Sequence, residues 1–202
     1  MTTPAAARRA RQLEERRERI VAAARALAEE QGWEAVTTRR LAEAIEYSQP
    51  VLYGHFPQGR TEIVTAVALA GFEELAAALA PSALGDAGSD DERVRALVGA
   101  YLDFAARHPA TYDAMFLLPV LVPFASEETP AVMREGFEAI AGTLRRLDDP
   151  PEDVETAAEV LWGAVHGLVA RGPVQLEPAA EEDPLVVRPD RAAVVLAVVG
   201  EA

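Results

Sequence analysis

The hydrophobic residues of this chain recur every three or four positions along most of its length, a spacing that places them on one face of successive α-helices. The first such segment ends at Gly32, a residue that tolerates the left-handed conformation common after a helix. The stretch at Val194–Val199 also fits the alternation of a strand, but no partner strand is predicted, and we expect a helix there. The longer helical segments are residues 11–31, 60–80, 89–108, 111–118, 129–148, 152–171 and 190–199.

A short helix is predicted at residues 37–45, where Thr37 or Thr38 can accept a hydrogen bond from a free backbone N–H. Its apolar seam is formed by Leu41, Ala42 and Ile45. With this helix and the one that follows it, the pattern predicts an all-α protein of about nine helices.

A second short helix is predicted at residues 48–56, with Ser48 as its cap and Pro50 in its first turn. Leu52 and Phe56 are four residues apart and therefore share one face, which we expect to be buried. The side chains left on or near the outer face are Gln49, Tyr53, Gly54 and His55.

Only residues 46–48 separate the two short helices, which predicts a sharp helix-turn-helix corner. In such a unit the first helix crosses the nucleic-acid backbone while the second lies in the major groove. The corner therefore indicates a protein that binds double-stranded DNA.

These residues together resemble the amino-terminal domain of tetracycline-repressor (TetR) family regulators. The resemblance implies a helix-turn-helix DNA-binding domain at residues 1–60, with a disordered arm at 1–10, and a helical ligand-binding and dimerisation domain at 61–202. The chain departs from the family at Glu46, where a glycine is usual, and at Gly59-Arg60, where a lysine often begins the next helix. The resemblance is carried by Ile20–Ala24, Leu27, Gly32, Val36–Thr37, Leu41–Ala42 and Leu52–Phe56.

The resemblance implies that the DNA contacts come from the two short helices and the start of the next helix. Gln49 is the best candidate for reading a base, because its amide can pair with N6 and N7 of adenine. Pro50, Val51 and Gly54 offer apolar or close contact with bases, so that part of the specificity is expected to rest on DNA shape. Residues expected to bind phosphates are Thr38, Arg39, Tyr53, His55 and Arg60, with Thr37 and Ser48 beside them.

Two later stretches, His108–Phe116 and Trp162–Gly167, resemble a TetR subfamily whose carboxy-terminal domain carries a Trp-His-Gly signature. The resemblance implies a bundle of five or six helices for the second domain.

Wide, mostly apolar side chains on these helices suit a pocket for a small hydrophobic effector. The alternative is that they fill the core, which is expected for most of them, and the two histidines are more often structural than ligand-binding. The candidate effector-binding residues are Tyr101, Phe104, His108, Tyr112, Phe116, Met133, Phe137, Trp162 and His166.

The family forms dimers through its last two helices, and a dimer would hold two recognition helices about 34–36 Å apart on a palindromic operator. Small residues four apart let another helix approach closely, although Gly163 and Gly167 could instead admit a neighbour within one subunit. The candidate interface residues are Gly163, Val165, Gly167, Val194 and Val198.

The net charge of −14 over 202 residues is unevenly distributed. Through Val64 the chain carries ten arginines against nine glutamates, whereas the remainder carries nine arginines against 24 acidic residues. DNA affinity depends on local phosphate neutralisation, so the acidity of the second part is compatible with DNA binding by the first. The arginines at residues 8–19 belong to the leading arm, where Arg8–Arg11 are the better candidates for phosphate contacts and a solvated helix face is the alternative.

The chain has no cysteine, which excludes disulfides and thiol chemistry. The apolar run at Met115–Ala125 is broken by Pro119 and Pro123, and neither a signal peptide nor a membrane span is expected. We therefore expect a cytoplasmic protein that needs neither a cofactor nor a metal.

The expected function is a DNA-binding transcriptional regulator, by family default a repressor, released from its operator by a small hydrophobic effector. A helical small-molecule-binding or protein-interaction module is the alternative. An all-helical enzyme is the weakest reading, because no nucleophile elbow, phosphate loop or metal-spaced histidine cluster accompanies Asp103, His108, Asp113 and His166.

Overall fold

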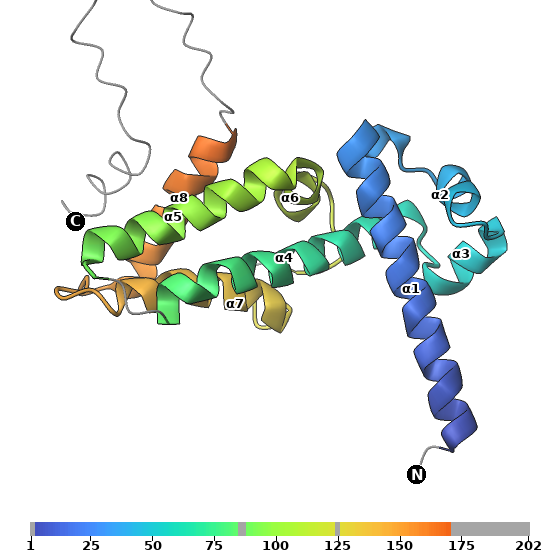
Figure 1. Cartoon of the computed structure of the whole chain (residues 1–202), viewed down its shortest axis with the longest axis horizontal. Helices are drawn as coiled ribbons and strands as arrows, with labels where there is room; N and C mark the ends of the chain where they lie inside the picture. Colours follow the sequence, from blue (N-terminus) through green and yellow to red (C-terminus); the bar gives the residue numbers. More distant parts are fainter. Residues whose placement is uncertain (1–2, 85–87, 124–125, 171–202) are drawn as a thin grey trace, which may run out of the picture. The chain divides into compact units, whose positions relative to one another are not determined.

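The computed structural model describes residues 3–84, 88–123 and 126–170, and this part of the chain is helical without a strand (Figure 1). The all-α prediction is confirmed with eight α-helices in the described part, while the helix predicted at 190–199 lies outside it. The elements are α1 Pro4–Gln31, the 3-10 turn η1 Trp33–Ala35, α2 Thr38–Ala44, α3 Gln49–His55, α4 Arg60–Leu84, α5 Asp90–Arg107, α6 Pro109–Phe116, α7 Ala131–Leu144 and α8 Val154–Ala170.

The helices form two compact units. The first unit lies within residues 1–72 and 108–130, and the second within residues 73–107 and 131–202. The unit that contains the helix-turn-helix therefore also contains α6 and the segment after it, which are distant in sequence.

Helix α1 begins earlier than the sequence suggests. The prediction of a helix from Arg11 and a disordered arm at 1–10 is wrong for residues 4–10, which are helical. The Thr3 hydroxyl accepts a hydrogen bond from Ala6 N at 3.3 Å, and Pro4 in the first turn loses no helical bond. Because the alanines that follow have the highest helix propensity, the helix extends to this cap.

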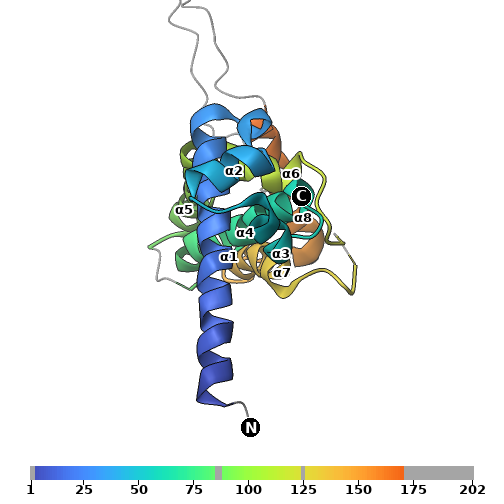
Figure 2. The same ribbon diagram turned by 90° about the vertical axis from the view of Figure 1, so that its right-hand side faces the viewer.

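The helix-turn-helix has the predicted buried seams except at Ile45, which directly follows α2 and is half-buried. In α2, Leu41 and Ala42 are buried, and the Thr37 hydroxyl accepts from Arg40 N at 3.2 Å. In α3, Leu52 is 1% exposed and Phe56, directly after the helix, is 0% exposed. Helix α2 contacts both α1 and α3, and the turned view in Figure 2 shows α2 in front of α1.

The turn between α2 and α3 forces a glutamate into a conformation that favours glycine. Glu46 has φ of +57°, the left-handed region that costs a residue with a Cβ about 1–2 kcal/mol. The sequence allowed either this conformation or a different turn, and the chain adopts the left-handed one. Strain is therefore stored beside the start of α3.

Helix α6 is held to α1 by a carboxylate and an indole. The Glu29 carboxylate of α1 accepts from Ala110 N and Thr111 N, both at 2.9 Å, and from Thr111 Oγ1 at 2.7 Å. Trp33 Nε1 donates to Ala110 O at 2.6 Å in a buried position. Glu29 therefore caps the N-terminus of α6, where a negative charge is favoured. Burial and then the charge of Glu29 raise the pKa of the neighbouring Asp113.

The first part of α4 crosses α6 at Gly71, where little space is left. A Cβ at this position would lie 2.7 Å from both Met115 Sδ and Thr111 Cγ2. The ring of Phe72 meets that of Phe116 edge-on, with centroids 5.3 Å apart. Glycine at this position therefore allows the two helices to approach, which fixes α6 from a second side.

Helix α4 is longer than the sequence predicts. It continues through Pro81 to Leu84, whereas the sequence predicts an end at residue 80. By length and composition alone, Arg60–Ala83 is apolar enough to cross a membrane. Half of its most apolar window is buried inside the fold, as in the core helix of a soluble protein. Among the buried side chains are Ile63, Val64, Val67, Leu75 and Leu79.

The second unit contains α5, α7 and α8, whose apolar faces form its core. Ser89 caps the start of α5, since its Oγ accepts from Glu92 N at 3.3 Å and donates to the Glu92 carboxylate at 3.2 Å. Core side chains include Leu97 and Val98 of α5, Ile140 and Leu144 of α7, and Leu161 and Val165 of α8.

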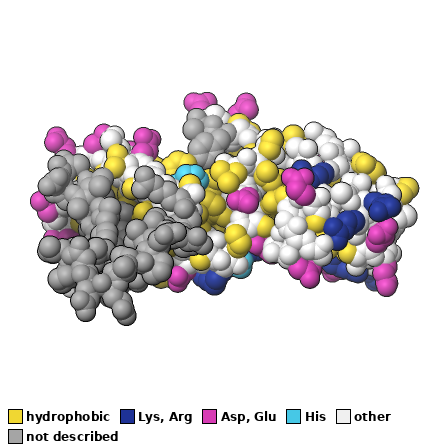
Figure 3. Space-filling model, turned by 90° about the horizontal axis from the view of Figure 1, so that it is seen from above, with side chains coloured by type: hydrophobic (Ala, Val, Ile, Leu, Met, Phe, Trp, Pro, Cys, Tyr) yellow, Lys and Arg dark blue, Asp and Glu magenta, His cyan; other side chains and the backbone are white. Residues whose placement is uncertain are grey.

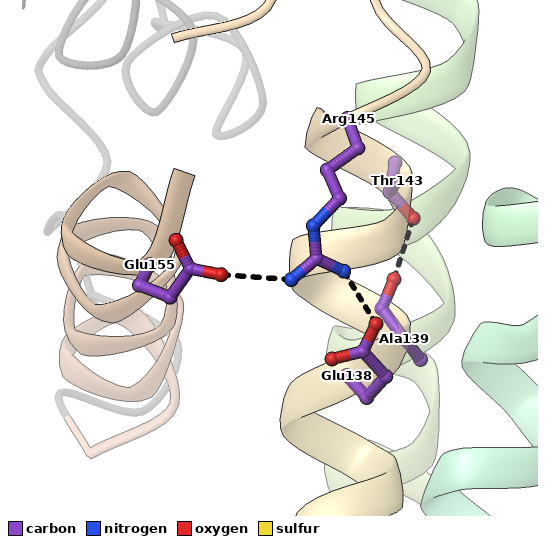
Figure 4. Close-up of polar contacts among 5 residues, drawn as sticks. All are labelled: Glu138, Ala139, Thr143, Arg145 and Glu155. Atoms are coloured by element: carbon purple, nitrogen blue, oxygen red, sulfur yellow. Dashed lines mark hydrogen bonds and ion pairs between the residues drawn. The ribbon is translucent and has the colours of Figure 1, made fainter. Parts of the chain in front are cut away.

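Helices α7 and α8 are also connected at the surface. Arg145, just after α7, binds Glu155 of α8 at 2.8 Å and also binds Glu138 of α7 (Figure 4). The three side chains are largely exposed, so the pairs add little stability in comparison with the buried faces.

Replacing Glu46 by glycine should stabilise the protein by about 0.5–1 kcal/mol, because glycine adopts a positive φ without a Cβ clash. Urea unfolding of the wild type and Glu46→Gly measures the difference. Glu46→Ala removes the same charge but keeps a Cβ, and it should give little or no gain. An equal gain in both variants would assign the effect to charge and not to backbone strain.

Replacing Glu29 by alanine should destabilise the protein by roughly 2 kcal/mol, because the buried N–H groups of Ala110 and Thr111 lose their acceptor. Glu29→Gln keeps one acceptor oxygen and should lose less. Urea unfolding provides the measurement, with Glu30→Ala as the matched exposed control, expected to stay within about 0.5 kcal/mol of the wild type. Equal losses in the two alanine variants would contradict the capping role.

Candidate nucleic-acid interface

The outer face of α3 is accessible to a partner, and its composition is polar and aromatic. Gln49, Pro50 and Gly54 are exposed, and Tyr53 is 48% exposed although it is a large aromatic residue. Val51 and His55 are half-buried. The buried seam of Leu52 and Phe56 directs this face outward, as the sequence predicts.

Arg17 of α1 holds the C-terminal end of α3. Its Nη1 donates to His55 O at 3.1 Å, and its guanidinium carbon lies 4.3 Å from the centroid of the Phe56 ring. A cation at this end is favourable, because the last carbonyl groups of a helix carry partial negative charge. Arg17 therefore fixes α3 on α1 at the end opposite Ser48.

Two further arginines of α1 lie over the turn that leads into α3. The guanidinium carbons of Arg16 and Arg19 lie 5.8 and 5.3 Å from the centroid of the Tyr47 ring. Tyr47 is half-buried and directly precedes Ser48, the residue before α3. One face of α1 is thereby placed beside the N-terminal end of α3.

Side chains of α2 and α3 meet at the start of α4. A Cβ built on Gly59 would lie 3.4 Å from Tyr53 Cε1 and 4.0 Å from Thr38 Cγ2. Gly59 has φ of +62°, which favours glycine independently of these contacts. The two candidate phosphate ligands Thr38 and Tyr53 are therefore close neighbours around Gly59.

Arg60 is bound to the backbone of the domain itself. Its Nε donates to Val36 O at 3.1 Å and its Nη2 to Trp33 O at 2.9 Å. These bonds connect the start of α4 to the end of η1. The sequence predicts that Arg60 binds a DNA phosphate, whereas in the structure its guanidinium binds two backbone carbonyl groups of its own domain.

The remaining candidates on α2 and before α3 differ in availability. Arg39 is exposed, and its Nε lies 3.8 Å from Glu43 Oε1. Such an exposed ion pair is weak, so the Arg39 side chain is free to rotate toward a partner. The Thr37 hydroxyl is used in capping α2. Ser48 occupies the predicted cap position with extended backbone, but among the described contacts its side chain makes no capping hydrogen bond.

The charge of this region is locally favourable for an anionic partner. Arginine side chains gather over the part of the chain that carries α1 to α3, with carboxylates between them (Figure 3). Burial, and then the charges of Arg16 and Arg17, lower the pKa of His55 below its ordinary value of 6.5, and Glu14 partly opposes them. His55 is therefore neutral at pH 7 and serves as a hydrogen-bonding group, not as a cation.

The candidate effector residues are divided between the two units. Tyr112 and Phe116 pack on each other in the first unit, with ring centroids 4.7 Å apart, and His108 belongs to that unit. In the second unit, Trp162 Nε1 donates to the Tyr101 hydroxyl at 3.2 Å, and the His166 ring lies 6.2 Å from that of Trp162. The other candidates of the second unit are Phe104, Met133 and Phe137.

A small void lies between α5, α7 and α8. Its volume is about 10 Å³, which is the space of about one water molecule. Of the nine candidate effector residues, Tyr101, Phe104, Tyr112 and Met133 are buried and the other five are half-buried. The lining residues are Leu97, Val98, Tyr101, Ile140, Leu161, Trp162 and Val165.

The candidate interface residues do not share one face of α8. Val165 is 3% exposed and lies in the core of the second unit, so the structure corrects its placement on an interface. Gly163 and Gly167 are exposed, and no other side chain lies within 4 Å of a Cβ built on either. They therefore do not serve to admit a neighbouring helix among the described residues. Val194 and Val198 lie outside the described residues.

Three arginines and one glutamate support the site in ways that the sequence did not predict. The sequence assigned Arg16, Arg17 and Arg19 to an arginine-rich arm or a solvated helix face, whereas they contact α3 or the turn before it. Glu29 had no predicted role, because its partners lie 81 and 82 positions away. No cluster of three potential metal ligands occurs among the residues that the structure describes.

Comparison with known protein families gives two matches. Residues 20–67 match the family described as "Bacterial regulatory proteins, tetR family", and residues 94–182 match the one described as "Tetracyclin repressor-like, C-terminal domain". The chain is also 27% identical over 153 residues to an uncharacterised HTH-type transcriptional regulator of Mycobacterium tuberculosis, Rv0681, over 76% of this chain and 68% of that protein.

Solved structures share the fold. A protein of unknown function from Rhodococcus sp. RHA1 superposes with a TM-score of 0.69 at 23% identity, over 92% of each chain. A possible TetR family transcriptional regulator from Streptomyces coelicolor A3(2) superposes with a TM-score of 0.60 at 23% identity, over 84% of this chain and 76% of the other. These likenesses establish the architecture of the chain.

The lowered pKa of His55 predicts a pH dependence of stability. Because the folded state binds the His55 proton less readily than the unfolded state, His55 should cost stability as pH falls below about 6.5. Urea unfolding at pH 7.5 and 5.5 should show a smaller loss for His55→Gln than for the wild type. An identical loss in both proteins would contradict the desolvated environment of the ring.

Proposed function

We propose that the chain is a DNA-binding transcriptional regulator of the TetR type, which represses transcription by binding a palindromic operator as a homodimer. The matches to a TetR-family N-terminal domain and to a tetracycline-repressor-like C-terminal domain support this proposal, and the relative is described as a transcriptional regulator. A small hydrophobic effector is proposed to release the operator. The protein is proposed to act in the cytoplasm, where DNA is accessible.

The observation that carries the proposal is the outward face of α3. A two-turn helix whose apolar residues are buried and whose other side is open has the shape that enters a major groove. We propose that Gln49 pairs with adenine and that Pro50, Val51 and Gly54 lie close to base edges. The DNA-binding domain is proposed to end near residue 60.

The phosphate contacts are proposed to surround this face. Tyr53 and Thr38, which meet at Gly59, can both donate hydroxyl hydrogen bonds, and Arg39 can add charge. Neutral His55 can donate one ring N–H. Arg60 would contribute only with donors not used on Trp33 and Val36, while Thr37 and Ser48 would offer their backbone or hydroxyl groups nearby.

The dimer is proposed to form through the open face of α8. The face that includes Val160, Gly163 and Gly167 is exposed and largely uncharged, and it can accept a second helix at short range. Residues 194 and 198 are proposed to complete the interface. Such a dimer would hold two α3 helices at the spacing of successive major grooves.

The effector is proposed to bind in the second unit, where Tyr101 and Trp162 offer polar atoms beside apolar walls. The void must enlarge when the effector binds, because it has room for about one water molecule. The Trp162–Gly167 stretch also supports assignment of this domain to the Trp-His-Gly subfamily.

Gln49→Ala should remove base preference at one position in each half-site and weaken binding to the selected operator by about 1–3 kcal/mol per half-site. Selection from random duplexes with the wild type supplies the operator, and fluorescence anisotropy gives the affinity. The dependence of affinity on salt should be unchanged, because Gln49 carries no charge. Unaltered preference at every operator position would contradict the readout role.

Salt dependence also separates DNA binding from a protein-interaction module. Affinity for the duplex should fall steeply with salt, because each neutralised phosphate releases counterions. Lack of binding by the wild type to any duplex would overturn the proposed function itself.

A further inference from the structure

The N-terminal part of α1 makes almost no contribution to the core. The first buried residue of the helix is Ile20, and before it only Ala7 and Arg17 are even half-buried. Residues 4–19 thus form about four turns of helix without a fully buried residue. Helical stability in proteins comes mostly from packing of one face, so these turns are unusual unless another molecule covers them.

The arginines of this segment are arranged on one side. At 100° per residue, Arg8, Arg9, Arg16 and Arg19 fall within an arc of about 100°, and no glutamate falls within it. Glu14 and Glu18 fall on the other side of the helix. Because Arg8 and Arg9 take part in none of the ion pairs or hydrogen bonds among the described residues, their charge is available to a partner.

The structure shows which way this arginine stripe faces. Arg16 and Arg19, its inner members, lie over the ring of Tyr47, the residue directly before Ser48. The stripe therefore starts beside the N-terminal end of α3 and continues along the same face of α1 toward its N-terminus. Arg8 lies eleven residues before Arg19, about 16 Å along the helix axis, which equals the axial length of about five base pairs.

The composition of the segment argues against other partners. A membrane-surface helix needs a broad apolar face, and a coiled coil needs apolar residues at heptad spacing. Between Pro4 and Arg19 the sole large hydrophobic residue is Leu13, 46% exposed. A stripe of arginines without an apolar face suits a partner bound through charge alone.

We propose that the N-terminal extension of α1 is a second DNA-binding element, in which Arg8 and Arg9 neutralise phosphates that flank the half-site read by α3. The proposal rests on the proposed function, because α3 must first place the duplex. The contact is independent of base sequence and adds affinity and salt dependence, not specificity. It also accounts for a helix that continues four turns beyond its packed part.

The test compares Arg8→Ala/Arg9→Ala with the wild type on the selected operator, with duplexes that carry either ten additional flanking base pairs on each side or none. Loss of two phosphate contacts per subunit should lower the slope of log affinity against log salt by about 1.8 per subunit. Between 50 and 200 mM salt the wild type should therefore lose about 12-fold more affinity per subunit than the variant. This difference should appear on the long duplex and vanish on the trimmed one.

Arg11 decides between an oriented stripe and a general charge effect. The sequence groups it with Arg8 and Arg9 as a phosphate ligand, but in the helix it falls outside the stripe while carrying the same charge and exposure. Arg11→Ala should keep nearly the wild-type slope. Circular dichroism should show unchanged helix content in all variants, since alanine favours helix at least as well as arginine. A slope reduction by Arg11→Ala of about 0.9 per subunit, half that of the double variant, would overturn the oriented stripe in favour of a general charge effect.

Two other outcomes would overturn the proposal while leaving the proposed function intact. The first is an unchanged salt slope in the double variant although Gln49→Ala still loses base preference. The second is that the wild type binds vesicles of phosphatidylserine and phosphatidylcholine, while the double variant does not bind them and still binds DNA as the wild type does. This result would assign the stripe to a membrane surface.

Discussion

Helix α1 supplies opposite charges to the ends of two other helices, and the first unit depends on this arrangement. Arg17 donates to the last carbonyl of α3, while the Glu29 carboxylate accepts from the first N–H groups of α6. In both cases the charge opposes the partial charge of the helix end. Because the two residues lie on one continuous helix, the positions of α3 and α6 are linked through α1. A displacement of α6 would have to break these bonds or move α1, and α3 is attached to α1 by Arg17 and by the burial of Phe56.

Features set by neighbours in sequence could be predicted. The seam of Leu52 and Phe56, the end of α1 at Gly32 and the caps at Thr37 and Ser89 each depend on residues within about one helical turn. Glu46 could be singled out because the family that the sequence resembles usually has a glycine at this position of the turn. Exposure of Gln49 and Tyr53 followed from the same short-range pattern.

Features set by distant partners could not be predicted. The acceptors of Arg60 are carbonyl groups 24 and 27 positions earlier, which residue type and spacing do not reveal. Likewise, Pro81 looks like a helix end, but the apolar face of α4 continues past it and keeps Ser82 buried. Tertiary packing outweighs a local helix breaker in this case. Val165 was misplaced because a stripe of small residues does not show which side of the helix meets the core.

The state of the second unit constrains how an effector could act. A void of about 10 Å³ cannot hold a drug-sized molecule, so binding must displace side chains and break the hydrogen bond between Trp162 and Tyr101. This rearrangement costs free energy, which the ligand has to offset by contacts that exist only in the enlarged state. A ligand shifts an equilibrium only by its difference in affinity for the two states. The reorganisation that would make room for the proposed effector is therefore also a change that can alter DNA affinity.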